Sequence, residues 1–323
     1  MKTQNSLYCN KKLGIRILFL PFAFIMFLIG IIRLLLASPY QSKAKVICVG
    51  NIAVGGVGKT PLVIKIVEHF LNQGLKVGIL SRGYKGKLSS KNPLIIDINK
   101  HNAEDVGDEA FMMAVKFNGK VPVCICSNRA KSAQLLENDV DILIMDDGLQ
   151  NYTLKKDKSV VVFDGEFGIG NGFIIPVGFL RETFAFGMKK ADVVVVMRKK
   201  NQQLENMVKK YKKPLFNAKT FAKPITKFKG KKVIAFAGIG NPNKFFNSLK
   251  SEGVKLEKTF NFPDHYQYKK SDFEDLIQKA NGLPIFTTMK DFVKIPAELK
   301  KYFNVLDIDL DIKNSEKFFL LLK

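Results

Sequence analysis

The sequence predicts an α/β fold, with a doubly wound, mostly parallel sheet followed by a second, smaller α/β domain. Short apolar runs alternate with segments of helical periodicity from residue 46 to residue 197. A lysine-rich stretch with two prolines then interrupts this alternation. A further strand, glycine turn and helix follow, beginning near residue 232. The expected organisation is an amino-terminal helix at 1–40, domains at 41–200 and 232–323, and a connector at 201–231.

Composition is consistent with this organisation and bounds the function. The chain has 323 residues, of which 46% are hydrophobic, enough for two domains with separate cores. Its net charge of +23 favours contact with an anionic surface, such as a membrane, a phosphorylated lipid or nucleic acid. A compositional bias toward lysine is the other explanation. Cys48, Cys124 and Cys126 lie in apolar runs without zinc spacing, which predicts buried thiols in a reducing compartment.

The first element is an apolar segment at residues 13–37. It is uncharged between Arg16 and Arg33. As a helix rising about 1.5 Å per residue, it is long enough to cross roughly 30 Å of hydrocarbon. We therefore expect an N-terminal membrane helix that anchors the chain, either spanning the bilayer or lying in one leaflet. A cleaved signal peptide or a buried core helix is the alternative.

The next element is a strand, glycine-rich turn and helix around VGNIAVGGVGKTP, residues 49–61. This order is that of a P-loop, in which backbone N–H groups bind phosphate. Ala53 stands where the general pattern has glycine, but three glycines remain. Lys59 is expected to reach the β- and γ-phosphates, and the Thr60 hydroxyl to bind Mg²⁺. The predicted phosphate-binding residues are Gly55, Gly56, Val57, Gly58, Lys59 and Thr60.

The remaining strands of the first domain are expected at 76–80, 94–97, 121–126, 141–145, 160–163 and 192–197. The strand at 141–145 leads into Asp146 and Asp147. An acidic pair at the end of a strand is typical of the metal site beside a P-loop, although an Asx turn with solvated carboxylates also explains it. Together with the glycine loop, this pair predicts a P-loop phosphotransferase or nucleotide hydrolase.

Two stretches of the first domain carry further groups suited to phosphoryl transfer to an alcohol. S-R-G-Y places Arg82 after a strand, where open sheets bind ligands, and an ordinary surface loop is the alternative. V-G-D-E places Asp108 and Glu109 at a helix start, which capping alone would also explain. A long glycine-rich loop at 168–182 is interpreted equally well as a functional loop or as a connector.

The second domain contributes His265, which lies beside Asp264 in N-F-P-D-H-Y. A histidine next to a carboxylate is suited to proton transfer, although the dipeptide is common. Strands of this domain are expected at 284–287 and 305–309, after the strand that begins at 232. We expect His265 to face the first domain across a cleft, so that the domains close on the substrate with the connector as hinge.

In combination these stretches resemble the tetraacyldisaccharide 4′-kinase family. V-G-N-x-x-V-G-G-x-G-K-T-P, S-R-G-Y, V-G-D-E, D-D-G-L-Q, G-N-G…P-x-G-x-L-R-E and F-x-D-H occur in the family's order across nearly the whole chain. The first of these patterns is far more specific than a general P-loop. The chain departs from the family pattern at Asn151, Phe173, Phe179 and Thr183.

The resemblance implies an ATP- and Mg²⁺-dependent kinase of lipid A (lipopolysaccharide) biosynthesis. Its acceptor would be the 4′-hydroxyl of a tetraacylated glucosamine disaccharide 1-phosphate, at the cytoplasmic face of the bacterial inner membrane. The implied partners are this glycolipid and the membrane, without nucleic acid, and the expected state is a monomer. The implied catalytic residues are Asp108, as base, His265 and Arg181; the implied metal ligands are Thr60, Glu109, Asp146 and Asp147; Arg82, Tyr84 and Gln150 would line the nucleotide site.

A membrane-tethered P-loop ATPase or switch protein is the main alternative. G-G-V-G-K-T is similar to the loop of partition ATPases, which carry a lysine just before the paired glycines. Val54 occupies that position here, which argues against an ATPase completed by a partner's lysine. A nucleic-acid binder is indicated only by the charge, since no recognisable RNA-binding module is present.

Overall fold

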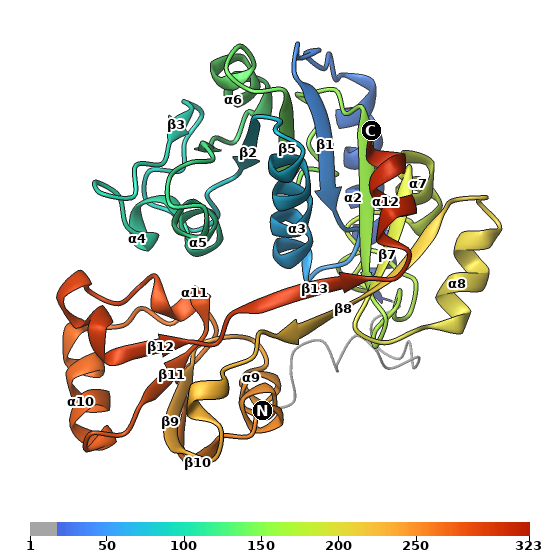
Figure 1. Cartoon of the computed structure of the whole chain (residues 1–323). Coiled ribbons are helices and arrows are strands. Elements are labelled where there is room, and N and C mark those ends of the chain that lie inside the picture. Colours follow the sequence, from blue (N-terminus) through green and yellow to red (C-terminus); the bar gives the residue numbers. More distant parts are fainter. Residues whose placement is uncertain (1–17) are drawn as a thin grey trace.

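The computed structural model describes residues 18–323 and contains a nine-stranded and a four-stranded sheet (Figure 1). The large sheet has the order β13-β8-β7-β6-β1-β5-β2-β4-β3. Its neighbouring strands are parallel except at the two edges, where β3 and β13 are antiparallel. The strands are β1 (Lys45–Gly50), β2 (Val77–Ser81), β3 (Leu94–Ile95), β4 (Val123–Ile125), β5 (Ile142–Asp146), β6 (Lys158–Asp164), β7 (Val193–Met197), β8 (Leu215–Ala222) and β13 (Ile308–Ile312).

Helices cover both faces of the large sheet, because successive strand residues point to opposite sides. In β1, Ile47 and Val49 belong to one buried cluster, and Val46 and Cys48 to another. The first cluster includes α3 (Lys59–Asn72), α5 (Asp108–Lys116) and α12 (Ser315–Leu322). The second includes α2 (Leu20–Leu35), α6 (Arg129–Leu136), α7 (Phe184–Lys190) and α8 (Gln202–Lys209). The predicted α/β fold with a mostly parallel sheet is confirmed.

The four-stranded sheet has the order β10-β9-β11-β12 and is parallel throughout. It lies on the side of the large sheet toward which β1 points (Figure 1). Separate apolar clusters lie on its two faces, one with α9 and one with α10. We call this unit the small lobe. Its elements are β9 (Lys232–Ala237), α9 (Pro242–Ser251), β10 (Lys255–Asn261), α10 (Lys270–Ala280), β11 (Ile285–Thr287), α11 (Met289–Phe292) and β12 (Phe303–Val305).

The strands of the large sheet cross the expected domain boundaries in two places. The stretch 201–231 is not only a connector, because it contains α8 and the long strand β8. The chain end, expected in the second domain, returns to the large sheet, where β13 pairs with β8 in the register Leu310↔Thr220. Phe216 of β8 packs edge-on against Phe318 of α12, which explains why this end is held there.

The apolar amino-terminal segment is only partly described. Residues 1–17 of the expected anchor lie outside the described residues, and the described part forms α2. Within residues 18–323, no helix is both long and apolar enough to cross a membrane. The 16 residues of α2 rise about 24 Å, less than a bilayer core of about 30 Å. Its Ala23 is buried, whereas most of its large apolar side chains, including Phe22, Ile25, Ile29 and Ile32, are exposed.

Candidate active site

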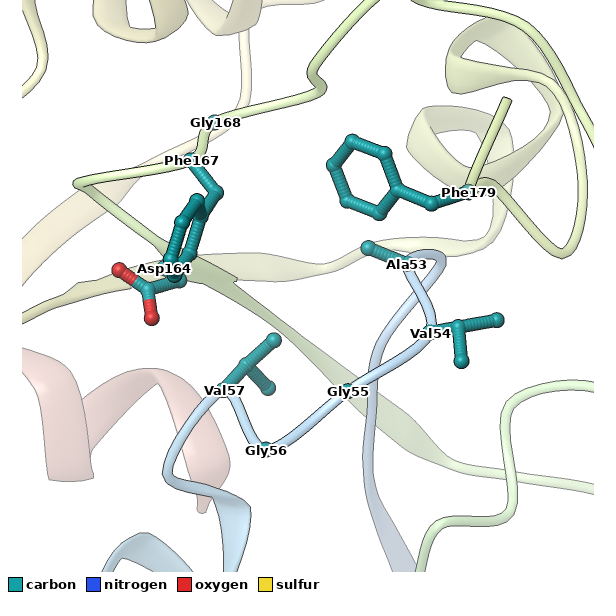
Figure 2. A pocket seen from close by; sticks show the side chains of 9 residues that line it. All are labelled: Ala53, Val54, Gly55, Gly56, Val57, Asp164, Phe167, Gly168 and Phe179. Carbon is teal, nitrogen blue, oxygen red and sulfur yellow. The ribbon is translucent and has the colours of Figure 1, made fainter. Parts of the chain in front are cut away.

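The predicted P-loop connects the end of β1 to the start of α3. Gly55 and Gly58 have φ angles of 118° and 89°, which favour glycine. Gly58 is the N-cap of α3, so the helix begins at Lys59 with its free N–H groups at the loop. This is the strand–turn–helix geometry that phosphate binding requires. A cavity of about 20 Å³ lies beside the loop, between it and the segment after β6; its walls are Ala53, Val54, Gly55, Gly56, Val57, Asp164, Phe167, Gly168 and Phe179 (Figure 2).

Lys59 extends from the P-loop toward the adjacent strand β5. Its Nζ donates to Asn51 Oδ1 at 3.2 Å and lies 3.5 Å from Asp147 Oδ1. Asn51 is completely buried and was not singled out by the sequence analysis. The parallel register Val49↔Asp146 brings the acidic pair beside the loop. The structure therefore places the predicted lysine and the predicted acids at one point.

The two neighbouring carboxylates of the pair are in opposite electrostatic environments. Burial, followed by the charge of Glu109, raises the pKa of Asp146 to about 7. Burial would also raise the pKa of Asp147, but Lys59 and Arg181 outweigh it and hold that pKa below its ordinary value. Asp147 has a left-handed φ of 48° and donates its N–H to Val49 O at 2.9 Å, which turns its side chain toward the loop.

The donor set fits a Mg²⁺ ion bound together with phosphates. Asp146 Oδ1 is buried without a hydrogen-bond partner, and Thr60 stands in the first turn of α3. Mg²⁺ is usually held by one or two carboxylates with substrate phosphates, rather than by a cage of protein ligands. Residues 18–323 contain no cluster of three or more His, Cys, Asp or Glu side chains able to hold a metal.

Arg181 and Gln150 complete this side of the site. The guanidinium of Arg181 donates to both oxygens of Asp147, at 2.9 and 3.0 Å. Gln150 donates to Asn51 O at 2.9 Å and to Glu182 Oε1 at 2.7 Å. Both predicted residues therefore contact the P-loop flank or the acidic pair directly.

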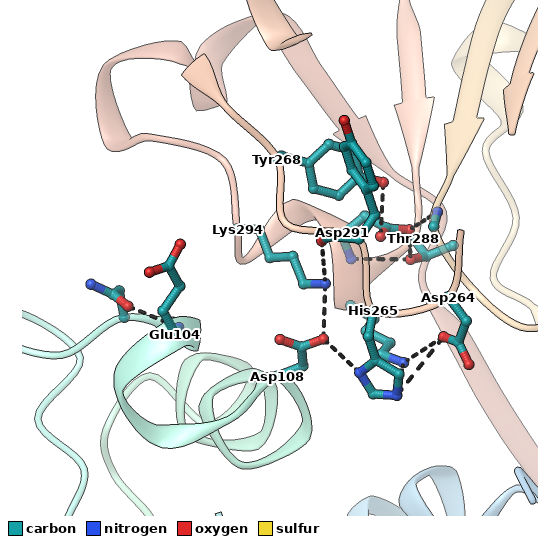
Figure 3. A network of polar contacts seen from close by, with 12 residues as sticks. Glu104, Asp108, Asp264, His265, Tyr268, Thr288, Asp291 and Lys294 are labelled. Atoms are coloured by element: carbon teal, nitrogen blue, oxygen red, sulfur yellow. Dashed lines mark hydrogen bonds and ion pairs between the residues drawn. The ribbon is translucent and has the colours of Figure 1, made fainter. Parts of the chain in front are cut away.

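The predicted base comes from the large unit and the predicted histidine from the small lobe (Figure 3). Asp108 is the first residue of α5, and Gly107 before it has a φ of 91°. His265 lies on the loop between β10 and α10. Its Nδ1 is 3.1 Å from Asp108 Oδ2, so the expected pairing of the two residues is present in the structure.

Two lysines that the sequence analysis did not single out also contact this pair. Lys294, just after α11, places its Nζ 2.8 Å from Asp108 Oδ2, and its side chain is only 7% exposed. The Nζ of Lys290 of α11 lies 3.3 Å from His265 Nε2 and 3.0 Å from Asp264 Oδ1. Burial would raise the pKa of Asp108, but hydrogen bonds from His265 and Lys294 lower it below its ordinary value.

Of the remaining predicted residues, Tyr84 lies beside His265 and Glu109 follows Asp108 in the chain. The Tyr84 ring faces His265 edge-on, with 6.4 Å between the ring centroids. Arg82 is exposed on the same loop, and its carbonyl accepts from Ser89. Glu109 is exposed beside Asp108, and its charge contributes to the raised pKa of Asp146. Glu109 therefore connects the two halves of the site electrostatically.

A further arginine, which the sequence analysis did not single out, donates a hydrogen bond to the backbone of the P-loop. Arg198 follows β7 and has a left-handed φ of 72°. Its Nη2 donates to Gly56 O at 3.1 Å, and its Nη1 pairs with the carboxylate of Asp164. No local pattern in the run M-R-K-K distinguishes this arginine from the lysines beside it.

A P-loop with an acidic pair on the adjacent strand, facing a carboxylate–histidine pair, defines a P-loop phosphotransferase. The chain belongs to the tetraacyldisaccharide 4′-kinase family, since residues 15–323 match the family model described as tetraacyldisaccharide-1-P 4′-kinase. It is therefore a kinase with an alcohol group as acceptor, of the family that acts in lipid A biosynthesis.

Relatives and a solved structure agree with this membership. A tetraacyldisaccharide 4′-kinase of Haemophilus influenzae is 39% identical over 319 residues, covering 96% of this chain and 92% of the relative. One from Paramagnetospirillum magneticum is 39% identical over 279 residues, covering 85% and 84%. A crystal structure of LpxK from Aquifex aeolicus in complex with ATP superimposes with a TM-score of 0.77 at 30% identity, covering 95% of this chain and 98% of that one.

Proposed function

We propose that the chain transfers the γ-phosphate of ATP to the 4′-hydroxyl of a tetraacylated glucosamine disaccharide 1-phosphate, at the cytoplasmic face of the bacterial inner membrane. Family membership supports this reaction. The observation that carries it is the Asp108–His265 contact, because it supplies a carboxylate of α5, held by a histidine of the small lobe, that can accept the proton of an acceptor hydroxyl. All of these groups come from one chain, as a monomer requires.

In this proposal Asp108 accepts the proton of the 4′-hydroxyl. Its Oδ2 contacts both His265 and Lys294. Its Oδ1 makes no hydrogen bond within the described part of the chain, so this oxygen is the one available to the hydroxyl. His265 then holds the carboxylate in position or takes the proton onward. Closure of the small lobe on the acceptor would bring these groups into line with the phosphate.

The phosphate side of the reaction depends on charge and alignment. Backbone N–H groups of residues 55–60 bind the phosphates, and Lys59 and Arg181 stabilise the charge that spreads over the transferred group. Arg82, Tyr84 and Gln150 line the nucleotide site in this assignment. Thr60 and Asp146, with Asp147 and Glu109 nearby, are the groups that would hold Mg²⁺. When bound, Mg²⁺ would neutralise negative charge on the phosphates.

Association with the membrane follows from the chemistry of the acceptor. A tetraacylated lipid stays in the bilayer, because each exposed CH₂ costs about 0.8 kcal/mol. The exposed apolar side of α2 and the net charge of +23 both support binding to an anionic membrane.

The test is phosphoryl transfer from labelled ATP to the acceptor dispersed in detergent. We expect labelled lipid from the wild-type chain. Asp108→Asn should lower transfer by about 10²- to 10⁴-fold, the usual effect of losing a general base, while ATP affinity stays unchanged. Release of phosphate at a normal rate without lipid, and no labelled lipid when it is added, would favour the ATPase instead. Loss of ATP affinity in Asp108→Asn would mean that Asp108 is structural.

A further inference from the structure

The loop between β6 and α7 presents an apolar edge that the proposed reaction does not use. Phe173 and Ile175 are 36% and 38% exposed, and Ile174 between them is buried. The segment thus alternates as an extended strand does, but its outward side carries large apolar groups instead of polar ones. We call Phe173 and Ile175 the loop edge.

Backbone hydrogen bonds attach the loop edge firmly to the P-loop flank. Ile175 N donates to Leu180 O at 2.9 Å, and Leu180 N donates to Phe173 O at 3.2 Å. Leu180 in turn bridges to Ala53 in antiparallel fashion. On either side of this bridge, Val54 N donates to Phe179 O at 2.8 Å and Arg181 N donates to Ile52 O at 2.6 Å. Three backbone segments therefore lie side by side, with the loop edge outermost and the P-loop flank innermost.

The loop edge and α2 lie on the same face of the large sheet. Ile174 and Leu180 belong to the buried cluster that also includes Ala23 of α2, and Phe27 of α2 packs against that cluster. Both elements thus turn buried residues toward one core and apolar residues outward. The exposed apolar surface of α2 consequently has a counterpart next to the phosphate site.

We propose that the loop edge is a second membrane-contacting surface, in which Phe173 and Ile175 enter the lipid bilayer beside α2. The inference rests on the proposed function, because only an acceptor embedded in lipid requires the phosphate site to lie at a bilayer surface. Insertion removes two large apolar side chains from water. It also sets the distance of the P-loop from the lipid, since the connection from Phe173 to Ala53 is a continuous backbone ladder.

Two double variants of the full chain test this surface. Phe173→Ser/Ile175→Ser is compared with Phe221→Ser/Leu320→Ser, which removes apolar side chains of 47% and 67% exposure from β8 and α12. The probe is sedimentation with phosphatidylcholine vesicles containing phosphatidylglycerol. We expect the loop-edge variant to bind on the order of ten-fold more weakly, and the control to bind as the wild type does. Phe173→Leu/Ile175→Leu should restore binding.

Further measurements separate this inference from a folding defect and from the proposed function. ATP affinity and the rate with detergent-dispersed acceptor should be unchanged in the loop-edge variant. If ATP affinity or this rate falls together with vesicle binding, or if vesicle binding equals that of the wild type, the inference is overturned. If the wild-type chain labels no lipid, the proposed function fails, whatever the vesicles show.

Discussion

One oxygen of the Asp108 carboxylate, Oδ2, contacts both a histidine and a lysine. His265 and Lys294 both contact Oδ2, and both come from the small lobe. A carboxylate held in this way stays ionised, but it is also a weaker base than a free one. In the proposed reaction, this arrangement favours the orientation of Asp108 over its basicity, as expected where alignment and charge supply most of the rate.

Lys294→Met should move the pH dependence of the reaction. Lys294 lowers the pKa of Asp108, so it keeps the base deprotonated to lower pH. Without this ammonium the pKa rises, and the acidic limb of kcat/KM moves to higher pH. Loss of one charge-assisted hydrogen bond, about 1.5–3 kcal/mol, should also lower kcat about ten-fold or more at neutral pH. Steady-state kinetics across pH measure both effects.

Lys294→Arg is the matched control for that prediction. Arginine preserves the charge, and the acidic limb should therefore stay near its wild-type position. If the acidic limb of kcat/KM is unchanged in Lys294→Met, the lysine has no effect on the protonation of Asp108.

Residue types alone predicted some of these partners and not others. Asp108, His265 and Lys59 stand in short patterns whose chemistry is visible in the sequence. Lys290 and Lys294 stand in M-K-D-F-V-K, which is indistinguishable from a solvated helix face in a chain with 52 lysines and arginines. Their contacts depend on how the small lobe faces α5, and no local pattern encodes that relation.

At the scale of elements, the strands of the large sheet were the most predictable part. Every strand expected between residues 46 and 197 is present, although the one expected at 94–97 is reduced to the two residues of β3. The alternation of Ile308, Leu310 and Ile312 is visible in the sequence, but it does not identify the sheet that they join. A strand's pattern records which face is buried, whereas its partner, here β8, lies far away in the chain.

Asp307 should stabilise the junction between α5 and the crossing strands. It accepts from Lys116 at 2.8 Å and pairs with Lys223 at 3.0 Å. Burial would raise the pKa of Asp307, but the two lysines lower it. The stabilisation is therefore present above the ordinary carboxyl pKa and is lost as the pH falls through the lowered one.

We expect Asp307→Asn to reduce the free energy of unfolding by about 1 kcal/mol at neutral pH, since the carboxylate is a third exposed. At an acidic pH below the lowered pKa of Asp307 the difference should vanish, because the wild-type carboxylate is then protonated. Urea unfolding at both pH values measures this. Asp311→Asn on β13, the strand that follows Asp307, is the control, as Asp311 forms no ion pair within residues 18–323. A deficit that persists in acid would argue for a packing effect.

At the scale of the whole molecule, the carboxyl ends of β1 and β5 lie on the side of the large sheet toward the small lobe, and α2 covers part of the opposite face from α3. In the proposed arrangement, membrane binding through α2 and the loop edge would place the phosphate loop near the lipid headgroups. The acceptor could then reach Asp108 while its acyl chains stay in the bilayer.

Ile25→Gln/Ile29→Gln/Ile32→Gln should weaken binding of the full chain to phosphatidylcholine–phosphatidylglycerol vesicles by on the order of ten-fold or more. Glutamine keeps helix propensity, and all three isoleucines are exposed, so the thermal unfolding midpoint should stay within a few degrees. Sedimentation with the vesicles measures the binding, and calorimetry measures the unfolding midpoint. Leu135→Gln, an exposed leucine of α6, should leave binding unchanged. Undiminished pelleting of the triple variant would assign membrane binding to other surfaces.

The antiparallel pairing of β8 with β13 has a consequence for how the chain is assembled. Ala222 and Ile308 are cross-strand partners, although the entire small lobe separates them in sequence. The small lobe is therefore an insertion whose two ends leave the large unit side by side, about 5 Å apart. A short hairpin turn between these two residues would close the large unit, leaving the phosphate loop and its metal acids in place. Asp108 and His265 thus lie on opposite sides of this junction, one in the large unit and the other in the insertion, so the contact between them depends on how the insertion is held.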